Sequence, residues 1–129
     1  GILRGLHFQT APKAQTKLVS VSNGEILDVV LDIRKDSPSY GKHCSVILND
    51  INNFQLLIPK GFAHGFVSLS EIVRVDYQVD NYYSSENEFG INPFDNDLNI
   101  NWILDKNQII INKRDRSHKN LSESPAYIF

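Results

Sequence analysis

The sequence predicts an all-β fold, either a sandwich or a barrel. Short runs rich in Val, Ile and Leu recur at intervals of about 8–12 residues, with turn-forming residues between them. No window keeps an apolar period of about 3.6 residues over three turns, as an amphipathic helix would. The chain has 129 residues and no low-complexity linker, so we expect one domain over residues 1–129.

The first two of these strands are predicted on either side of a tight turn. Residues 17–21 alternate between apolar and polar side chains, which is the pattern of a half-buried strand. The dipeptide Asn23-Gly24 follows and is a strong signal for a hairpin turn. Residues 26–33 resume the strand pattern with many β-branched side chains, and a polar segment around Pro38 ends it.

Four further strands are predicted, at residues 44–48, 54–58, 63–69 and 72–79. Turn-forming residues such as Asn49 and Gly61 separate them. From about Asn92 the chain becomes polar and rich in Asn, with apolar anchors at residues 102–104 and 109–111. We expect this tail to form loops, one or two short helices and one edge strand.

Charge and cysteine content exclude several classes of protein. The formal net charge of -2 gives no reason to expect nucleic acid or an acidic membrane surface as a partner. No stretch approaches the roughly 20 apolar residues of a membrane span, and no signal peptide is visible. The single cysteine, Cys44, cannot form an internal disulfide, which is typical of a reducing cytoplasm. We expect a cytoplasmic protein in which Cys44 is a small buried apolar residue, with a catalytic thiol as the alternative.

Two histidines occupy positions of an incomplete metal-binding pattern. Residues 59–64 have the form P-x-G-x-x-H, the second half of the cupin pattern, and end at His64. In metal-binding cupins the first half supplies H-x-H and a nearby Glu. Here the matching place has His7 with Gln9 two residues on, and the next acid, Glu25, is too far along. Because zinc or iron needs three converging protein ligands, we expect no metal.

Without a metal, His7 and His64 inside a barrel suggest acid–base chemistry near neutral pH. A catalytic histidine needs an orienting partner on its second ring nitrogen, usually a carboxylate. The sequence alone does not choose among the candidates, which are Asp28, Asp32, Asp76 and Asp115. The alternative is that both histidines are core residues satisfied by backbone groups.

Two cations near His7 raise the same question. Arg4 and His7 point to opposite faces of a regular strand, unless Gly5 allows a bulge. Lys17 opens an apolar strand. Arg4 and Lys17 together could bind a phosphate or an enolate oxygen, or they could be two surface cations on an edge.

Tyrosines complete the candidate set. By strand parity Tyr77 shares a face with Val75 and Val79, so it points inward if those valines are core residues. There it could donate a proton, or it could simply pack. Tyr82 and Glu88 are predicted in a loop, where an aromatic ring could stack on a base or merely cover the barrel mouth.

Together these segments resemble the dTDP-4-dehydrorhamnose 3,5-epimerases, cupin-type nucleotide-sugar epimerases. The resemblance extends from Gly1 to about Leu121, nearly the full length of the chain. It is carried by five motifs in the family's order and spacing: GILRGLHFQ at 1–9, QTKLV at 15–19, DVVLDIRKDSPSYG at 28–41, QLLIPKGFAHGF at 55–66 and KRDR at 113–116. It implies a cupin-type jelly-roll β-barrel with a short C-terminal helical and loop segment.

The resemblance also implies roles for individual residues. His7 is similar to the family's general base, and Asp115 to the carboxylate paired with it. Lys17 matches the residue that stabilises the enolate oxygen, and Tyr77 matches the acid that returns a proton to the opposite face. The implied substrate-binding residues are Arg4, Gln9, Gln15, His64, Tyr82 and Glu88.

The implied activity is inversion of C3 and C5 in a nucleotide-linked 4-keto-6-deoxy sugar, from dTDP-4-dehydro-6-deoxy-D-glucose to dTDP-4-dehydro-L-rhamnose. A base, a cation and an opposed acid suffice for this chemistry, so we expect no cofactor. The alternatives are a C3-only epimerase or keto-isomerase, and a cupin that binds a sugar nucleotide without turnover; Gln9 disfavours a metal-dependent oxygenase. The implied partners are a dTDP-linked sugar and a second copy in a homodimer. The family carries an N-terminal segment before the first motif, and we expect that this sequence lacks it.

Overall fold

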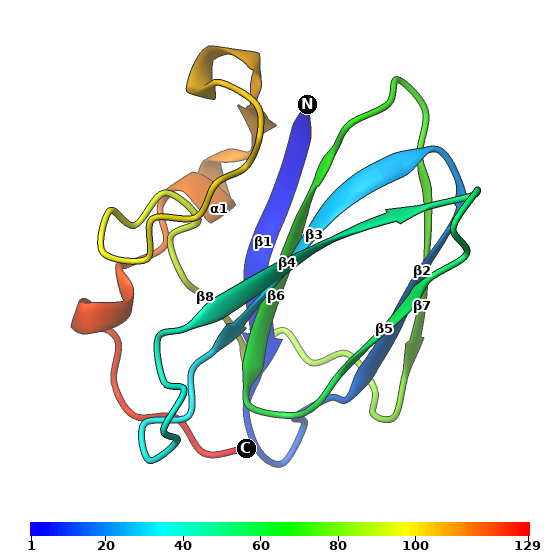
Figure 1. Cartoon of the computed structure of the whole chain (residues 1–129). Helices are drawn as coiled ribbons and strands as arrows, with labels where there is room; N and C mark the ends of the chain where they lie inside the picture. Colours follow the sequence, from blue (N-terminus) through cyan, green and yellow to red (C-terminus); the bar gives the residue numbers. More distant parts are fainter.

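The computed structural model describes all 129 residues and consists mainly of two β-sheets (Figure 1). The larger sheet has six strands in the order β4-β3-β6-β1-β8, with β9 beside β1, and the smaller sheet has the order β5-β2-β7. The strands are β1 (Ile2–Gln9), β2 (Lys17–Asn23), β3 (Glu25–Asp32), β4 (His43–Asn49), β5 (Gln55–Ile58), β6 (Phe62–Ser68), β7 (Arg74–Val79), β8 (Glu88–Gly90) and β9 (Ile110–Ile111). The short helices are η1 (Lys106–Gln108), α1 (Lys113–Arg116) and η2 (Leu121–Glu123). The predicted all-β architecture is confirmed.

Strand β3 is covered on both faces, which explains its nearly continuous apolar sequence. Leu27, Val29 and Leu31 pack into the core on the outer side of the larger sheet. Ile26 and Val30 point the other way and pack against residues of β2 and β5 in the core between the two sheets. The site described below lies on this inner side.

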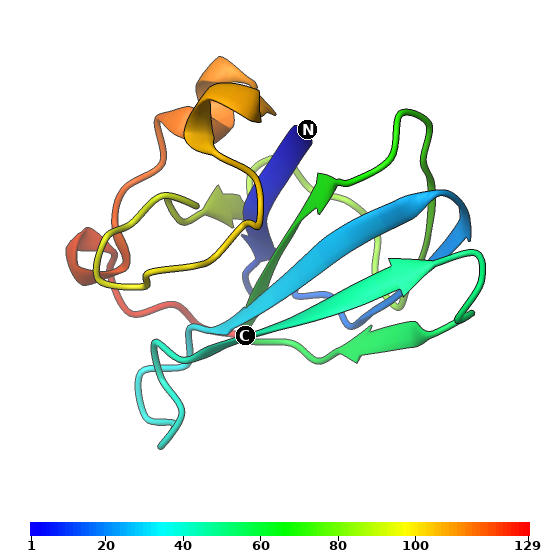
Figure 2. The same cartoon turned by 45° about the horizontal axis from the view of Figure 1, so that its top comes forward.

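The C-terminal third of the chain covers the outer face of the larger sheet. Figures 1 and 2 show it wound beside β1 and β8. Trp102, Ile109 and Leu121 are buried in the same core as the outer face of β3, and Trp102 Nε1 donates to the Pro93 carbonyl at 2.8 Å. Strand β9 pairs with β1 in parallel, so the predicted tail of loops, short helices and one edge strand is confirmed. No helix is long or apolar enough to cross a membrane.

Two sequence predictions are wrong. Cys44 is exposed rather than buried, because it lies on β4, the outermost strand of the larger sheet. Glu88 begins the three-residue strand β8 rather than lying in a loop, because this segment pairs with the end of β1. So short a strand has too few residues to show an alternating pattern in the sequence.

Candidate active site

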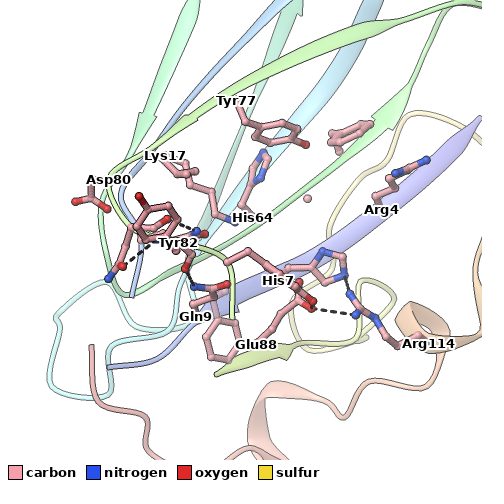
Figure 3. A pocket seen from close by; sticks show the side chains of 17 residues that line it. Arg4, His7, Gln9, Lys17, His64, Tyr77, Asp80, Tyr82, Glu88 and Arg114 are labelled. Atoms are coloured by element: carbon pink, nitrogen blue, oxygen red, sulfur yellow. Dashed lines mark hydrogen bonds and ion pairs between the residues drawn. The ribbon is translucent and has the colours of Figure 1, made fainter. Parts of the chain in front are cut away.

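A cavity of about 870 Å³ opens on the inner side of the larger sheet (Figure 3). Nine of the ten site residues predicted from the sequence line it: Arg4, His7, Gln9, Gln15, Lys17, His64, Tyr77, Tyr82 and Glu88. The tenth, Asp115, contacts the ring of His7. The fold thus gathers the whole candidate set in one place, from both ends of the chain and from both sheets.

A bulge in β1 places Arg4 and His7 on the same side of the strand. The pairing of β1 with β6 changes register between these two residues. Gly5, between them, has a φ of +120°, which glycine tolerates, and a Cβ at this position would lie 2.6 Å from Gly65 Cα. The bulge that we considered possible at Gly5 is therefore present. Leu6 is buried in the outer core.

His7 is held by a buried carboxylate. Its Nε2 lies 2.6 Å from Asp115 Oδ1, and the Asp115 side chain is fully buried while that of His7 is 22% exposed. The other carboxylate oxygen accepts the Gly5 N–H at 3.0 Å. Asn112 caps α1 by accepting the Asp115 N–H at 2.7 Å. The ring of His7 is therefore fixed through Nε2, and its Nδ1 makes no hydrogen bond within the chain.

The surroundings of Asp115 keep it ionised. Burial alone would raise the pKa of Asp115. The hydrogen bond from the Gly5 N–H, and the hydrogen bond and charge of His7, outweigh burial and hold the pKa below its ordinary value of 3.8. At neutral pH the carboxylate is therefore negatively charged.

A second histidine–carboxylate pair lies deeper in the barrel. His64 Nε2 is 2.8 Å from Asp28 Oδ2, and both side chains are buried. Asp28 Oδ1 is buried without a hydrogen-bond partner. The His64 ring meets the Tyr77 ring edge-on, with centroids 6.0 Å apart. Both histidines thus have carboxylate partners, and neither is satisfied by backbone groups alone.

The remaining two candidate carboxylates lie away from both histidines. Asp32 accepts hydrogen bonds from the side chains of Arg34, Ser37 and Ser39 and so ties down the loop after β3. Asp76 is exposed on β7. Neither contacts a histidine.

Lys17 and Tyr77 line the cavity from neighbouring strands of the smaller sheet. Burial lowers the pKa of the Lys17 ammonium below 10.5, while the charges of Glu88 and Asp28 oppose this shift. Burial, followed by the negative charge of Asp28, raises the pKa of Tyr77 well above its usual 10, with Arg4 acting in the opposite direction. Tyr77 therefore carries its proton at neutral pH and is able to donate it.

The two glutamines support the loop at the cavity mouth. Gln9 Nε2 donates to the carbonyls of Lys13 and Tyr82, at 2.6 and 3.2 Å. Gln15 Nε2 donates to the Asn81 carbonyl at 2.8 Å. The ring of Tyr82 is 84% exposed beside the cavity. Contact of these three residues with a substrate stays a prediction.

Arg114 and His118 are site residues that the sequence interpretation missed. Arg114 Nη1 donates to Glu88 Oε2 at 2.9 Å, and its Nη2 lies 3.3 Å from His7 Nε2 (Figure 3). His118 Nε2 lies 3.5 Å from Asp115 Oδ1. The signal for both is their position relative to Asp115, since one precedes it and the other follows at the i+3 spacing of one helical face. The donor atoms of His7, Asp115 and His118 lie within 4.8 Å of one another, close enough to share a metal ion.

The fold and the cavity together are those of one class of protein, the cupin-type sugar epimerases. A model of the dTDP-4-dehydrorhamnose 3,5-epimerases matches residues 1–123. The chain belongs to the dTDP-4-dehydrorhamnose 3,5-epimerase family, which is a family of isomerases.

Relatives of known name agree over most of the chain. The dTDP-4-dehydrorhamnose 3,5-epimerase of Methanothermobacter thermautotrophicus is 46% identical over 129 residues, which are 99% of this chain and 69% of the relative. That of Escherichia coli is 45% identical over 115 residues, 89% of this chain and 62% of the relative. Four curated relatives are matched over 55–69% of their own length.

Solved structures support the same fold. The enzyme of Legionella pneumophila, in complex with dTDP-4-keto-L-rhamnose, has 44% identity and a TM-score of 0.92, covering 98% of this chain and 66% of that one. The enzyme of Bacillus anthracis, with TDP and PPi bound, has 46% identity and a TM-score of 0.89, covering 93% and 67%. The predicted cupin-type barrel is therefore confirmed.

Proposed function

We propose that this chain, as part of the whole protein, epimerises a dTDP-linked 4-keto-6-deoxy sugar at C3 and C5 without a cofactor. The product from dTDP-4-dehydro-6-deoxy-D-glucose is dTDP-4-dehydro-L-rhamnose. The observation that carries the proposal is the pair His7–Asp115, which opens onto a cavity that the protonated Tyr77 enters from the other sheet. Membership of the family supports the same activity.

His7 is the general base in this proposal. Its Nε2 is engaged by Asp115, so Nδ1 takes the proton from the sugar carbon next to the 4-keto group. The electron pair of the broken C–H bond forms a carbon–carbon double bond, and the carbonyl π electrons move to the oxygen as an enolate. The ionised Asp115 stabilises the imidazolium that results.

The enolate oxygen needs a nearby positive charge. Lys17 offers an ammonium group in the cavity, where burial strengthens its interaction with a negative oxygen. His64 lies in the same cavity with its ring fixed by the Asp28 carboxylate. We assign it to positioning the keto oxygen beside Lys17.

Inversion requires that a proton return to the opposite face of the carbon. Tyr77 donates it: the electron pair of the carbon–carbon double bond forms the new C–H bond, the carbonyl re-forms, and Tyr77 becomes a phenolate, whose charge Arg4 favours. His7 then loses its proton to solvent and Tyr77 takes one up, so both residues return to their starting state. The same set acts on C3 and on C5 in turn.

Two nucleotide-containing ligands in related structures support a dTDP-linked substrate. In this chain we assign Arg4 to the pyrophosphate or sugar, and the exposed Tyr82 ring to stacking on the base. Gln9, Gln15 and Glu88 complete the proposed substrate contacts at the cavity mouth.

We also propose that the whole protein is a cytoplasmic homodimer. Strands β5 and β7 are the two outer strands of the smaller sheet. Large apolar side chains of β5 and the segment before it, Ile51, Phe54 and Leu57, are exposed. The exposed free thiol of Cys44 is typical of a reducing compartment. Light scattering after gel filtration tests the dimer, and a monomer at all concentrations contradicts it.

Heavy water tests the activity directly. The chain is incubated with dTDP-4-dehydro-6-deoxy-D-glucose in D₂O, and deuterium at C3 and C5 is followed by NMR. We expect deuterium at both positions and the L-rhamno product. Deuterium at C3 alone supports the C3-only alternative, which one relative, a 3'-monoepimerase from Streptomyces bikiniensis with 31% identity, exemplifies. Tight binding without exchange at either carbon contradicts an epimerase.

A further inference from the structure

A third imidazole lies beside the pair His7–Asp115. His118, two residues past α1, packs edge-on against the His7 ring, with centroids 5.8 Å apart. Its Nε2 is buried, makes no hydrogen bond and lies 3.5 Å from Asp115 Oδ1. The same oxygen is 2.6 Å from His7 Nε2. One carboxylate oxygen thus faces two imidazole nitrogens, of which only one is hydrogen-bonded to it.

The backbone of β8 holds this arrangement in place. Gly90 of β8 pairs directly with His7. The His118 ring packs against Gly90 so closely that a Cβ at this position would overlap it. His118 therefore has a defined position next to His7.

The three donor atoms have a spacing that suits a small transition-metal ion. Tetrahedral zinc binds its ligands at about 2.0–2.1 Å, which places the donor atoms about 3.3 Å apart. The separations of 2.6 and 3.5 Å at Asp115 Oδ1 lie on either side of that value, and all three atoms are within 4.8 Å of one another. Shifts of about an ångström or less in the side chains would complete three corners of a tetrahedron.

We propose that His7, Asp115 and His118 form a binding site for Zn²⁺ or a similar divalent transition-metal ion, and that the bound ion inhibits the enzyme. The ion replaces the proton between His7 and Asp115. The inhibition rests on the proposed function, because a neutral imidazole that ligates a metal through Nε2 carries its proton on Nδ1, the atom that removes the sugar's proton in that proposal. Two imidazoles and a carboxylate are a usual zinc ligand set, with water in the fourth position, whereas Mg²⁺ prefers oxygen ligands alone.

Arg114 is the cation that a metal ion must displace. Its Nη2 is 3.3 Å from His7 Nε2, and its Nε is 3.7 Å from Asp115 Oδ1. The Arg114 side chain is 57% exposed and pairs with Glu88, so it can rotate toward solvent. Replacement of Arg114 by Gln should therefore tighten metal binding severalfold.

Calorimetric titration with zinc chloride at neutral pH tests the site. We expect one Zn²⁺ per chain, with affinity reduced about tenfold or more by His118→Ala. His43→Ala is the matched control, because His43 lies on β4 and does not line the cavity; its affinity should equal that of the unchanged chain. Equal affinity of His118→Ala and the unchanged chain, or no zinc binding at all, overturns the proposal.

Nuclear magnetic resonance and kinetics provide two further tests of the zinc site. If His118→Ala does not fold, the ¹⁵N shifts of the histidine rings in the unchanged chain decide: His7 and His118 should move with zinc, and shifts at His43 alone contradict the site. Zinc should also slow epimerisation, and EDTA should restore it. Zinc binding at the cluster without epimerase activity contradicts the proposed function and supports the site, whereas activity unaffected by saturating zinc overturns the inhibition.

Discussion

The two histidine–carboxylate pairs have the same composition but differ in exposure and in their neighbours. The side chain of His7 is 22% exposed and that of His64 only 4%, while both carboxylates are fully buried. Asp115 accepts the Gly5 N–H as well as the bond with His7. Asp28 is hydrogen-bonded to His64 alone, and its second oxygen has no partner.

This difference supports the two separate roles that we propose for the two pairs. A base must reach the substrate and then return its proton to solvent, which requires an exposed ring with a firmly held partner. His7 meets both conditions. His64 is enclosed between Phe66 and Tyr77, so its pair suits the orientation of a bound keto group rather than repeated proton transfer. Position in the barrel, rather than residue type, distinguishes the two.

The largest expected difference between the two pairs is in the kcat of variants that lack one carboxylate. Asp115→Asn should lower kcat about 10²- to 10³-fold, because the amide neither holds His7 in the required tautomer nor stabilises its imidazolium. Asp28→Asn should lower kcat only about tenfold, since it disturbs a positioning group. Steady-state kinetics on both purified variants provide the measurement. Equal losses would show that the two pairs do not differ in role. A larger loss in Asp28→Asn would show that the roles are assigned the wrong way round.

Tyr77→Phe separates proton removal from proton return. The ring that packs against His64 is kept, and only the donor hydroxyl is lost. We expect product formation to fall about 10²-fold while deuterium exchange at the sugar continues, because His7 still removes and returns the proton on one face. NMR follows both rates in one sample. Loss of exchange in proportion to product formation would contradict a separate acid.

The same carboxylate variants should also differ in folding. Asp115→Asn loses a charged acceptor for two groups and should destabilise the chain by about 2–3 kcal/mol, against about 1 kcal/mol for Asp28→Asn. Urea unfolding, monitored by circular dichroism, measures both. A larger loss for Asp28→Asn would mean that the deeper pair is the structural one.

The smallest expected effect is on the free energy of unfolding at acidic pH. The pKa of Asp115 is below 3.8 in the folded chain, so its ionised form contributes stability that is complete above about pH 4 and is lost as the pH falls through the lower folded value. Below about pH 4 the free energy of unfolding should therefore fall less steeply in Asp115→Asn than in the unchanged chain. Asp32, whose pKa Arg34 holds strongly lowered, contributes equally in both chains and cancels. If the free energy of unfolding falls equally steeply with pH in both chains, Asp115 is not ionised with a lowered pKa.

Much of the fold is predictable because local patterns and packing agree. The strand patterns that begin near residues 17, 26, 44, 54 and 63 all correspond to observed strands, whose two faces pack against different cores. The errors at Cys44 and Glu88 have a common cause. Whether β4 lies at a sheet edge, and whether β8 pairs with β1, depends on contacts distant in the sequence.

The residues of the candidate site were predicted from the sequence, but the pair His7–Asp115 was implied by the family resemblance alone. The sequence offered four carboxylates for two histidines, and the structure pairs His7 with a residue 108 positions away. No local pattern reports such a contact. Arg114 and His118 were missed for the same reason, since their importance follows only from the place where Asp115 meets β1. The bulge at Gly5 was the exception, because glycine itself is the local signal.

Deuterium exchange in His7→Asn and His64→Asn tests most directly which pair removes the proton. Both variants are incubated with the 4-keto sugar nucleotide in D₂O, and exchange at C3 is followed by NMR with substrate near saturation. We predict that the rate of exchange at C3 falls at least about 10³-fold in His7→Asn. In His64→Asn the same rate should fall by no more than about a hundredfold. Exchange at the unchanged rate in His7→Asn, or its loss in His64→Asn alone, would contradict His7 as the base.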